Sequence, residues 1–405
     1  MRTRDFLKLY IGQLGSGVGD RLHQMALLGV VLQVHQTARV EETARLVFYG
    51  TLPVLLFSLL AVAWTDRWSR KLTMVAADWL RAGFAFAIPL IRHFDPSVRA
   101  LYGVVFVMGT LATFHGPARL AALPRIAEPR LLMAANALSN SSGAVAGLLA
   151  IPLAGLAVQA LGPNPCFVID GFTFLFSGLL IALVSRDLRP LSEDGVAAQP
   201  RSTLGDMRAG LAYVAKQAEA LPLVLLGGVF AFVSGVLLVA VLAFATAELK
   251  LSAFGVGLLI SSGGAGMAVG LVIVGKSNRL RRMSALPYWA HILMGVCIAA
   301  VPLSRSAWLA GLAWLGVGAM AGLATVPADT RLQEIVPDAR RGGVFSAKQL
   351  LAALAFLLAL WVQFATRQLC ELPPPTVLAG LGVLSAAGGA MLYGMHRAAT
   401  RVRTV

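Results

Sequence analysis

Apolar stretches of about twenty residues recur from one end of this sequence to the other. A helix that crosses the hydrocarbon core of a bilayer, about 30 Å thick, needs roughly 20 mainly apolar residues. Of the 405 residues, 58% are hydrophobic and 13% are charged, whereas about a quarter of an ordinary soluble domain is charged. The sequence therefore predicts an all-α membrane protein. We expect twelve transmembrane helices, at residues 6–34, 45–64, 72–91, 98–122, 131–161, 165–185, 222–247, 253–275, 284–302, 306–327, 343–366 and 375–395.

The distribution of basic residues predicts the topology. The formal net charge is +15, a value that in a soluble protein suggests a nucleic-acid partner. If the N-terminus lies inside, however, 25 of the 34 lysines and arginines fall in the inner segments and 7 in the outer ones. The positive-inside rule then predicts both termini in the cytoplasm, in a multi-pass protein of the cell inner (plasma) membrane, and no nucleic-acid partner. The first span is too long for a secretory signal peptide, so we expect it to remain attached.

A polar segment divides the chain almost in half. We expect an N-terminal six-helix bundle at 1–185, a cytoplasmic linker at 186–220 and a C-terminal six-helix bundle at 221–405. In the linker, apolar residues recur at helical spacing at Leu204, Met207, Leu211 and Val214. This spacing favours a short amphipathic helix on the inner membrane surface, and a plain connector is the alternative.

An internal repeat supports two similar halves. The pair Pro117-Ala118 is matched by Pro327-Ala328, and Ile126 by Ile335, at an offset of about 210 residues. A basic run follows both the second and the eighth expected span at nearly the same offset. Two parallel six-helix repeats are typical of transporters whose halves rock around a central site.

The segment after the second span, TDRWSRKLTMVAADWLRA at 65–82, resembles the major facilitator superfamily, whose pattern here is GxxxDRxGRR/K. The residues that match are Asp66, Arg67, Arg70 and Lys71. Val62 and Ser69 stand where the pattern has glycine. The resemblance implies a fold of two pseudo-symmetric six-helix bundles. It also implies that Asp66 meets the start of the eleventh helix and gates the protein, with Arg67, Arg70 and Lys71 in the same loop.

Other motifs are most similar to the drug:proton antiporter branch, which contains macrolide-efflux proteins and enterobactin exporters. They are GPARLAALP at 116–124, FVIDGFTF at 167–174 and a degenerate Gly/Pro motif in the fifth helix with Gly147, Pro152 and Gly155. This likeness implies proton-coupled efflux of an amphipathic small molecule, such as a drug, macrolide or siderophore-like compound, by alternating access. The lysophospholipid transporters share Gly19-Asp20, so a lipid transporter or flippase of the same fold is the alternative.

Charged side chains inside the expected spans are the best candidates for the mechanism, because each costs about 2.5–3.5 kcal/mol at a helix centre. They are Asp20, Arg21, Asp78, Arg81 and Asp170. In the first helix a polar stripe, expected to face the central cavity, is formed by Gln13, Ser16, Asp20 and Gln24. Because a low-dielectric site favours a protonated carboxyl group, Asp20 is the preferred proton-coupling residue. Alternatively, Arg21 or another base holds Asp20 as a lock between helices. For His23, three residues on, we expect a hydrogen bond to Asp20.

The remaining deep charges have less specific roles. Asp78 and Arg81 share one face of the third helix, where we expect them to act in gating or structure rather than in substrate contact. The resemblance also implies that Arg70 and Asp78 complete the charge cluster of the gate. Asp170 lies near the outer end of the sixth helix, where it is either solvated or part of transport. The second half offers only Lys348, so we expect it to supply mostly apolar wall.

Other functional classes lack support. The six histidines are scattered and no phosphate loop or metal motif is present in the sequence, which argues against an enzyme, a metal site or a cofactor. A ring of selectivity groups, as in a channel, is also missing. The expected partners are a small-molecule or lipid-like substrate, protons and membrane lipids, and we expect a monomer.

Overall fold

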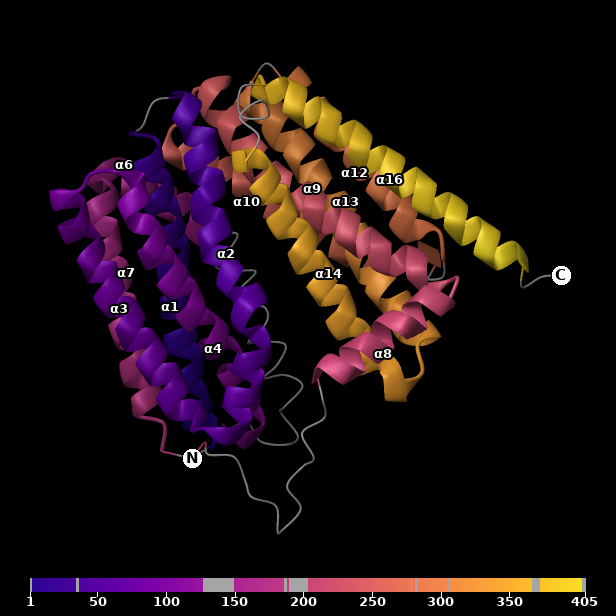
Figure 1. The fold of residues 1–405 in the computed structure, drawn as a ribbon. Coiled ribbons are helices and arrows are strands. Elements are labelled where there is room, and N and C mark those ends of the chain that lie inside the picture. Colours follow the sequence, from indigo (N-terminus) through magenta and orange to yellow (C-terminus); the bar gives the residue numbers. More distant parts are fainter. Residues whose placement is uncertain are drawn as a thin grey trace, which may run out of the picture. The chain divides into compact units, whose positions relative to one another are not determined.

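The computed structural model describes residues 2–33, 36–126, 149–185, 188, 203–277, 279–280, 283–304, 306–365 and 372–402. In these residues all regular secondary structure is helical, which confirms the expected fold class. The chain forms two compact units (Figure 1). One comprises Met1–Gly195 with Ser252–Leu258, and the other comprises Val196–Leu251 with Leu259–Val405.

The first unit is built from long helices that pack side by side. They are α1 (Arg2–Val31), α2 (Gln36–Arg67), α3 (Arg70–Phe94), α4 (Tyr102–Ile126), α6 (Ile151–Leu161) and α7 (Pro163–Ala182), with a 3-10 turn, η1, at Val98–Leu101. Helix α7 packs against α1 and α3, and α4 packs against α2 and α3. Ser69 separates α2 from α3 because its hydroxyl caps the amide of Leu72. Gly162, with a φ of +81°, forms the turn between α6 and α7.

The second unit has the same kind of architecture. Its helices are α8 (Thr203–Lys216), α9 (Ala220–Ala247), α10 (Ala253–Lys276, whose residues 253–258 belong to the first unit), α12 (Leu286–Ala300), α13 (Ala307–Ile335), α14 (Asp338–Ala365) and α16 (Pro374–Val402), with a 3-10 turn, η4, at Val301–Leu303. Helix α16 packs against α9 and α12, and α14 packs against α8 and α9. Helix α8 lies where the sequence predicts a short helix, and it is held there by packing on α14.

Nine stretches among the described residues are long and apolar enough to cross a membrane. They are Arg70–Phe94, Val98–Leu123, Pro163–Ala182, Ala220–Ala247, Ala253–Lys276, Leu286–Leu303, Ala307–Ile335, Gly343–Gln363 and Pro374–Arg401. Helix α1 has 30 residues but is more polar, and parts of α2 and most of the expected fifth span lie outside the described side chains. Among the described residues, nine of the twelve expected spans thus meet this measure.

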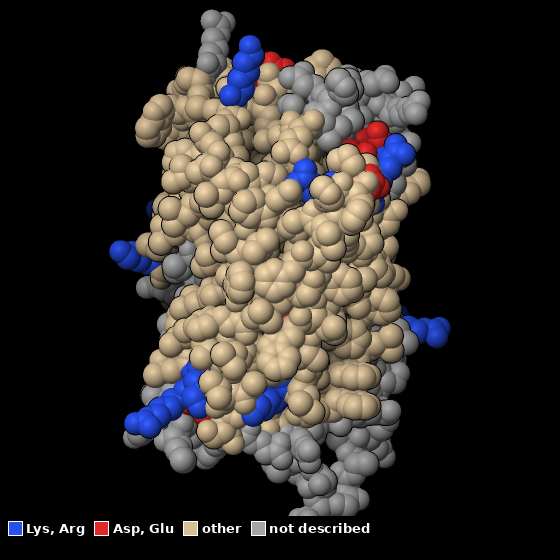
Figure 2. Space-filling model, turned by 90° about the vertical axis from the view of Figure 1, so that its left-hand side faces the viewer, with Lys and Arg blue, Asp and Glu red and all other residues tan. Residues whose placement is uncertain are grey.

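Exposed apolar side chains cover much of these helices, as lipid-facing helices require. Leu90, Leu153 and Val272, for example, are all more than half exposed. The centre of the face drawn in Figure 2 is almost wholly uncharged, while lysine, arginine and acidic side chains lie toward its ends, and basic side chains also project at its two side edges. This distribution is what a bilayer-spanning surface needs.

Glycines let two helices of the second unit touch backbone to backbone. A Cβ atom on Gly266 of α10 would collide with the carbonyl oxygen of Leu315 in α13, and one on Gly270 would collide with that of Ala319. From the other side, a Cβ on Gly318 would meet the carbonyl of Gly263. Close approach through small residues is the usual way in which membrane helices associate, because burial of apolar surface gives little advantage in lipid.

This packing predicts that Gly266→Ala lowers the free energy of unfolding by about 2 kcal/mol, because the added methyl group forces α10 and α13 apart. The measurement is thermal unfolding of the purified protein in detergent. Gly264→Ala in the same helix is the matched control, since a Cβ there meets nothing within 4 Å and alanine has the better helix propensity. Equal destabilisation by both substitutions would contradict the interlocked packing.

Candidate functional site

Asp20 forms an ion pair with Arg81, which joins α1 to α3. The Arg81 guanidinium also lies over the ring of Phe174 in α7, with 3.9 Å between its Cζ atom and the ring centroid. The side chain of Asp20 is 39% exposed and that of Arg81 is 11% exposed. Arg21, the partner first considered for Asp20, instead donates a hydrogen bond to Gln24 at 2.9 Å. The base that holds Asp20 therefore comes from another helix.

The glycine before Asp20 explains how α1 comes so close to α7. A Cβ atom on Gly19 would overlap the hydroxyl of Thr173 and lie 2.5 Å from Oδ1 of Asp170. A larger residue at this position would require the side chains of Thr173 and Asp170, or the helices themselves, to move. The Gly19-Asp20 pair thus combines a contact surface for α7 with a carboxylate that faces α3.

His23 contacts Asp170 rather than Asp20. Its Nδ1 atom lies 3.0 Å from Oδ2 of Asp170, and both side chains are buried. The hydroxyl of Thr173 donates to the main-chain carbonyl of Asp170 at 2.8 Å. Asp170 is 0% exposed, so the prediction that it could simply be solvated was wrong. The expected hydrogen bond from His23 to Asp20 was also wrong, because residue spacing along α1 says nothing about the facing helix.

Asp78 forms a third polar contact, with His115 of α4. Nε2 of His115 and Oδ1 of Asp78 are 3.5 Å apart, a distance for an ion pair but not for a hydrogen bond. Asp78 is 0% exposed, and within the described part of the chain neither carboxylate oxygen has a hydrogen-bond partner. A carboxylate buried in this way is costly unless a proton or a cation compensates it. The sequence analysis missed His115, because a lone histidine within an expected span is only a weak signal.

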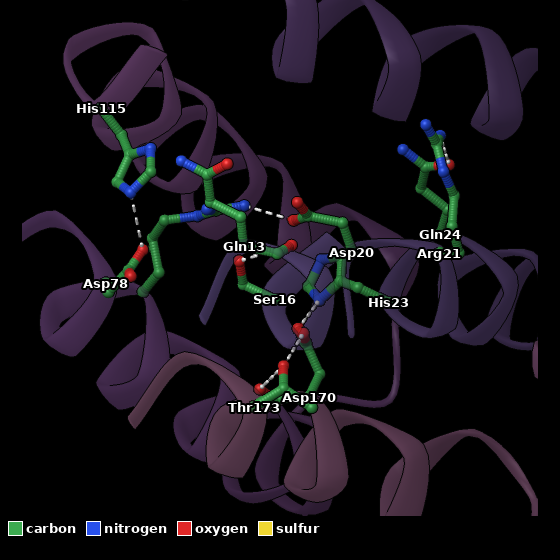
Figure 3. A network of polar contacts seen from close by, with 11 residues as sticks. Gln13, Ser16, Asp20, Arg21, His23, Gln24, Asp78, His115, Asp170 and Thr173 are labelled. Atoms are coloured by element: carbon green, nitrogen blue, oxygen red, sulfur yellow. Dashed lines mark hydrogen bonds and ion pairs between the residues drawn. The ribbon is translucent and has the colours of Figure 1, made fainter. Parts of the chain in front are cut away.

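These three contacts lie close together in the first unit (Figure 3). Arg119 of α4 adds a hydrogen bond to Gln13 at 3.4 Å, and Ser16 donates to the carbonyl of Gln13 at the same distance. Arg21 and Gln24 lie apart from the group in Figure 3. Gln13 and Ser16 are buried whereas Gln24 is exposed, so the predicted polar stripe of α1 does not share one environment along its length. We call Asp20, Arg81, Asp78, His115, His23 and Asp170 the α1–α3–α4–α7 cluster.

The expected gating loop has a partly structural role. Nζ of Lys71 donates to the carbonyl of Val184 at 2.7 Å, and Lys8 donates to that of Leu183 at 2.5 Å. These carbonyls follow the C-terminal end of α7, where a positive charge is favourable. Lys71 therefore helps to fix the end of α7. Arg70 has a half-buried side chain at the start of α3, and the side chains of Asp66 and Arg67 lie outside the described residues.

The helix-five motif is described in part. Gly147 lies outside the described residues, whereas Pro152 and Gly155 belong to α6. A Cβ atom on Gly155 would lie 2.5 Å from the carbonyl oxygen of Ala253, and one on Gly257 would lie 3.0 Å from Cα of Pro152. All of these residues belong to the first unit. Gly155 therefore allows close packing of α6 against the start of α10.

The second unit is more polar inside than the sequence analysis expected. Lys348 of α14 forms an ion pair with Asp329 of α13. His291 is 0% exposed, and its Nε2 atom lies 3.3 Å from the hydroxyl of Ser385 in α16. The expectation of a mostly apolar wall was therefore incomplete. Asp329 was missed because it lies just beyond the expected end of its span.

The chemistry available to the α1–α3–α4–α7 cluster is proton transfer and ion pairing. Within the residues that the structure describes, no group of three or more His, Cys, Asp or Glu side chains could hold a metal ion. The cluster instead alternates carboxylates with a guanidinium and two imidazoles, deep in helices that lie among apolar spans. Such intramembrane ionisable groups are typical of proton relays and ion pathways.

Comparison with known proteins agrees with the fold. Residues 9–360 match the Major Facilitator Superfamily. The uncharacterised MFS-type transporter YfiS of Bacillus subtilis (strain 168) is 24% identical over 88% of this chain and 85% of its own. YkuC of the same strain, also an uncharacterised MFS-type transporter, is 21% identical over 58% of this chain but only 55% of its own length.

Several solved structures of transporters have a similar fold. A bacterial homologue of the human lysosomal transporter Spinster, crystallised in an inward-facing and unoccupied conformation, has a TM-score of 0.71 at 15% identity, over 99% of this chain and 97% of its own. The POT family transporter PepTSo has a TM-score of 0.72 at 12% identity, over 98% of both chains. The chain therefore belongs to the Major Facilitator Superfamily and is a multi-pass membrane transporter, not an enzyme.

Proposed function

We propose that this protein is a proton-coupled exporter of an amphipathic small molecule that works by alternating access. It acts as a monomer in the cell inner membrane, with both termini in the cytoplasm as the positive-inside rule predicts. The observation that carries the proposal is the buried α1–α3–α4–α7 cluster, in which Asp20 is paired with Arg81 and both other carboxylates face histidines. Each step below concerns the first unit alone.

The charge balance of the cluster favours proton binding. Its charged neighbourhood comprises the carboxylates of Asp20, Asp78 and Asp170, the guanidinium groups of Arg81 and Arg119, and the imidazoles of His23 and His115. With both imidazoles neutral, the carboxylates outnumber the guanidinium groups by one. Uncompensated charge is expensive at this depth, so one bound proton stabilises the cluster.

Asp20 is the best-placed group to exchange that proton with water. Its side chain is 39% exposed, whereas the side chains of Asp78 and Asp170 are 0% exposed. Protonation of Asp20 removes the charge that holds Arg81 and so weakens the link between α1 and α3. A change of protonation is thereby converted into a change of helix contacts, as proton-driven transport requires.

The substrate class rests on the motif resemblance. The segments 116–124 and 167–174 favour the drug and siderophore exporters. The Gly19-Asp20 pair, which packs α1 on α7, favours the lysophospholipid transporters as the second candidate. The two candidates differ in energetics, because an exporter needs the proton gradient and a flippase moves lysolipid without one.

We expect Asp20→Asn to reduce gradient-driven transport to the level of protein-free vesicles, since asparagine cannot take up the proton. The measurement uses proteoliposomes with an acidic interior and a panel of macrolides, siderophores, dyes and lysolipids. Asp95→Asn is the matched control, because Asp95 is exposed and accepts hydrogen bonds from the nearby Ser97, including one from its amide at 2.9 Å.

Two outcomes of this assay would overturn parts of the proposal. If Asp20→Asn transports every active substrate at the original rate and pH dependence, the coupling assignment to Asp20 is wrong. If the wild-type protein moves only lysolipids, and does so equally with and without a pH gradient, the flippase candidate replaces the exporter. Accumulation of a drug or siderophore that disappears when the gradient is collapsed supports the exporter.

Asp170 is expected to position the cluster rather than exchange protons with water. Asp170→Leu leaves His23 without its partner in a buried site and should lower stability by about 2 kcal/mol. Asp170→Asn can still bond to His23, so it should cost less and preserve the pH dependence of transport. Thermal unfolding and the proteoliposome assay measure the two effects. Loss of gradient dependence in Asp170→Asn, with retention in Asp20→Asn, would reverse the roles of these carboxylates.

A further inference from the structure

We infer that Asp78 and His115 form a second proton-binding site, and that Arg81 alternates between Asp20 and Asp78 as protons enter and leave. In the structure Arg81 pairs with Asp20, while Asp78 faces His115. The inference deepens the proposed function, since it gives the route by which one proton bound at Asp20 leads to release of another. The exchange of partners by Arg81 is nevertheless a property of the folded protein and is testable without transport.

Asp78 is a charged group that lacks adequate compensation in this arrangement. Its side chain is 0% exposed and neither carboxylate oxygen accepts a hydrogen bond from the described residues. His115 is near enough for ion pairing, at 3.5 Å, but is not aligned for a hydrogen bond. A buried carboxylate with only this contact is stabilised most when the imidazole is protonated or when a stronger hydrogen-bond donor replaces it.

Arg81 is a donor within reach. It lies three residues after Asp78 on α3, and side chains at this spacing share one face, with Cβ atoms about 5–6 Å apart. Nε of Arg81 is buried and has no hydrogen-bond partner among the described residues. The guanidinium can therefore turn from Asp20 to Asp78 by a change of side-chain rotamer, without movement of α3.

The exchange conserves charge and protons. Initially Asp20 is ionised and bound by Arg81, while Asp78 and His115 share one proton. A proton then binds the Asp20 carboxylate, and the neutral carboxyl group releases Arg81. Arg81 pairs with the Asp78 carboxylate, and the proton on His115 loses its counter-charge and departs. One proton has bound and one has left, so the net charge of the cluster is unchanged.

The positions along the helices give this exchange a direction. Asp78 lies three residues, or about 4.5 Å along the helix axis, nearer the start of α3 than Arg81, which contacts Asp20 of α1. Both helices begin on the cytoplasmic side in the topology that the positive-inside rule predicts. Proton binding at Asp20 and release at His115 therefore move charge inward, as proton-driven export requires.

The other charged groups around His115 are few. Helix α1 contributes Asp20, α3 contributes Asp78 and Arg81, and α4 contributes Arg119. On the neighbouring α7, Asp170 is engaged with His23 of α1. On α2 the described acidic and basic groups near Tyr102, namely Glu41, Glu42 and Arg45, form a separate network at the outer end. Arg81 is the group whose movement changes the local charge most.

The direct test follows the protonation of His115 by NMR in lipid nanodiscs, with ¹⁵N-labelled histidine and a His115→Gln sample to assign its signals. Asp20→Asn mimics protonated Asp20, so Arg81 should move to Asp78. The titration midpoint of His115 should then fall by about one pH unit or more. In an Arg81→Gln background, the same Asp20 substitution should change the midpoint much less. Equal changes in both backgrounds, or no change in either, would overturn the inference.

A stability cycle tests the same exchange if the Arg81 variant does not fold. Asp20→Asn and Asp78→Asn each leave Arg81 one carboxylate, whereas the double variant leaves it neither. The drop in melting temperature of the double variant should exceed the sum of the single drops by about 3 °C or more. Additive drops would mean that Asp78 is not an alternative partner for Arg81. Both measurements are independent of transport, so they distinguish failure of this inference from failure of the proposed function.

Discussion

The ion pair between Asp20 and Arg81 is the interaction on which the polar interior of the first unit depends. Arg81 carries a permanent positive charge among apolar helices, and Asp20 of α1 supplies the direct counter-charge to this residue of α3. The ring of Phe174 in α7 also stabilises the guanidinium through a cation–π contact. Because these groups come from three helices, any change in the charge of Asp20 acts on the packing of the unit and not on one residue alone.

Lipid as the solvent explains why polar contacts and glycines occur together. Apolar side chains gain little by leaving lipid for protein, so helices associate through close backbone contact and hydrogen bonds. Gly19 lets α1 approach Asp170 and Thr173 closely, and His23 then bonds to Asp170 at 3.0 Å. In the second unit, Gly266 and Gly270 perform the packing task for α10 and α13. A coupling site in this environment needs both features. The glycines bring charged groups together, and the polar contacts make those groups costly to separate.

The sequence sufficed to predict the fold class and most of the charged candidates. Asp20, Arg81 and Asp170 stood out because charges are rare in apolar spans, and each lies in the cluster. Their partners were not predictable, because a partner on another helix is set by packing and not by spacing, as His23 and Asp170 demonstrate. His115 was overlooked since a lone histidine gives a weak signal, and Asp66 and Gly147 lie where the structure describes no side chain. Predicting these pairs requires knowing which helices face each other.

The internal repeat also allows individual positions of the two units to be compared. At the offset of 210 residues, Asp78 and Arg81 of α3 correspond to Tyr288 and His291 of α12, which are both 0% exposed. Likewise Arg119 corresponds to Asp329, the partner of Lys348. The same positions of the repeated scaffold therefore hold polar groups in both units, but the acidic and basic pair occurs in the first and a tyrosine and a histidine in the second. A duplicated fold keeps the places where polar side chains can be buried, while substitution at those places gives the two units different sets of polar groups.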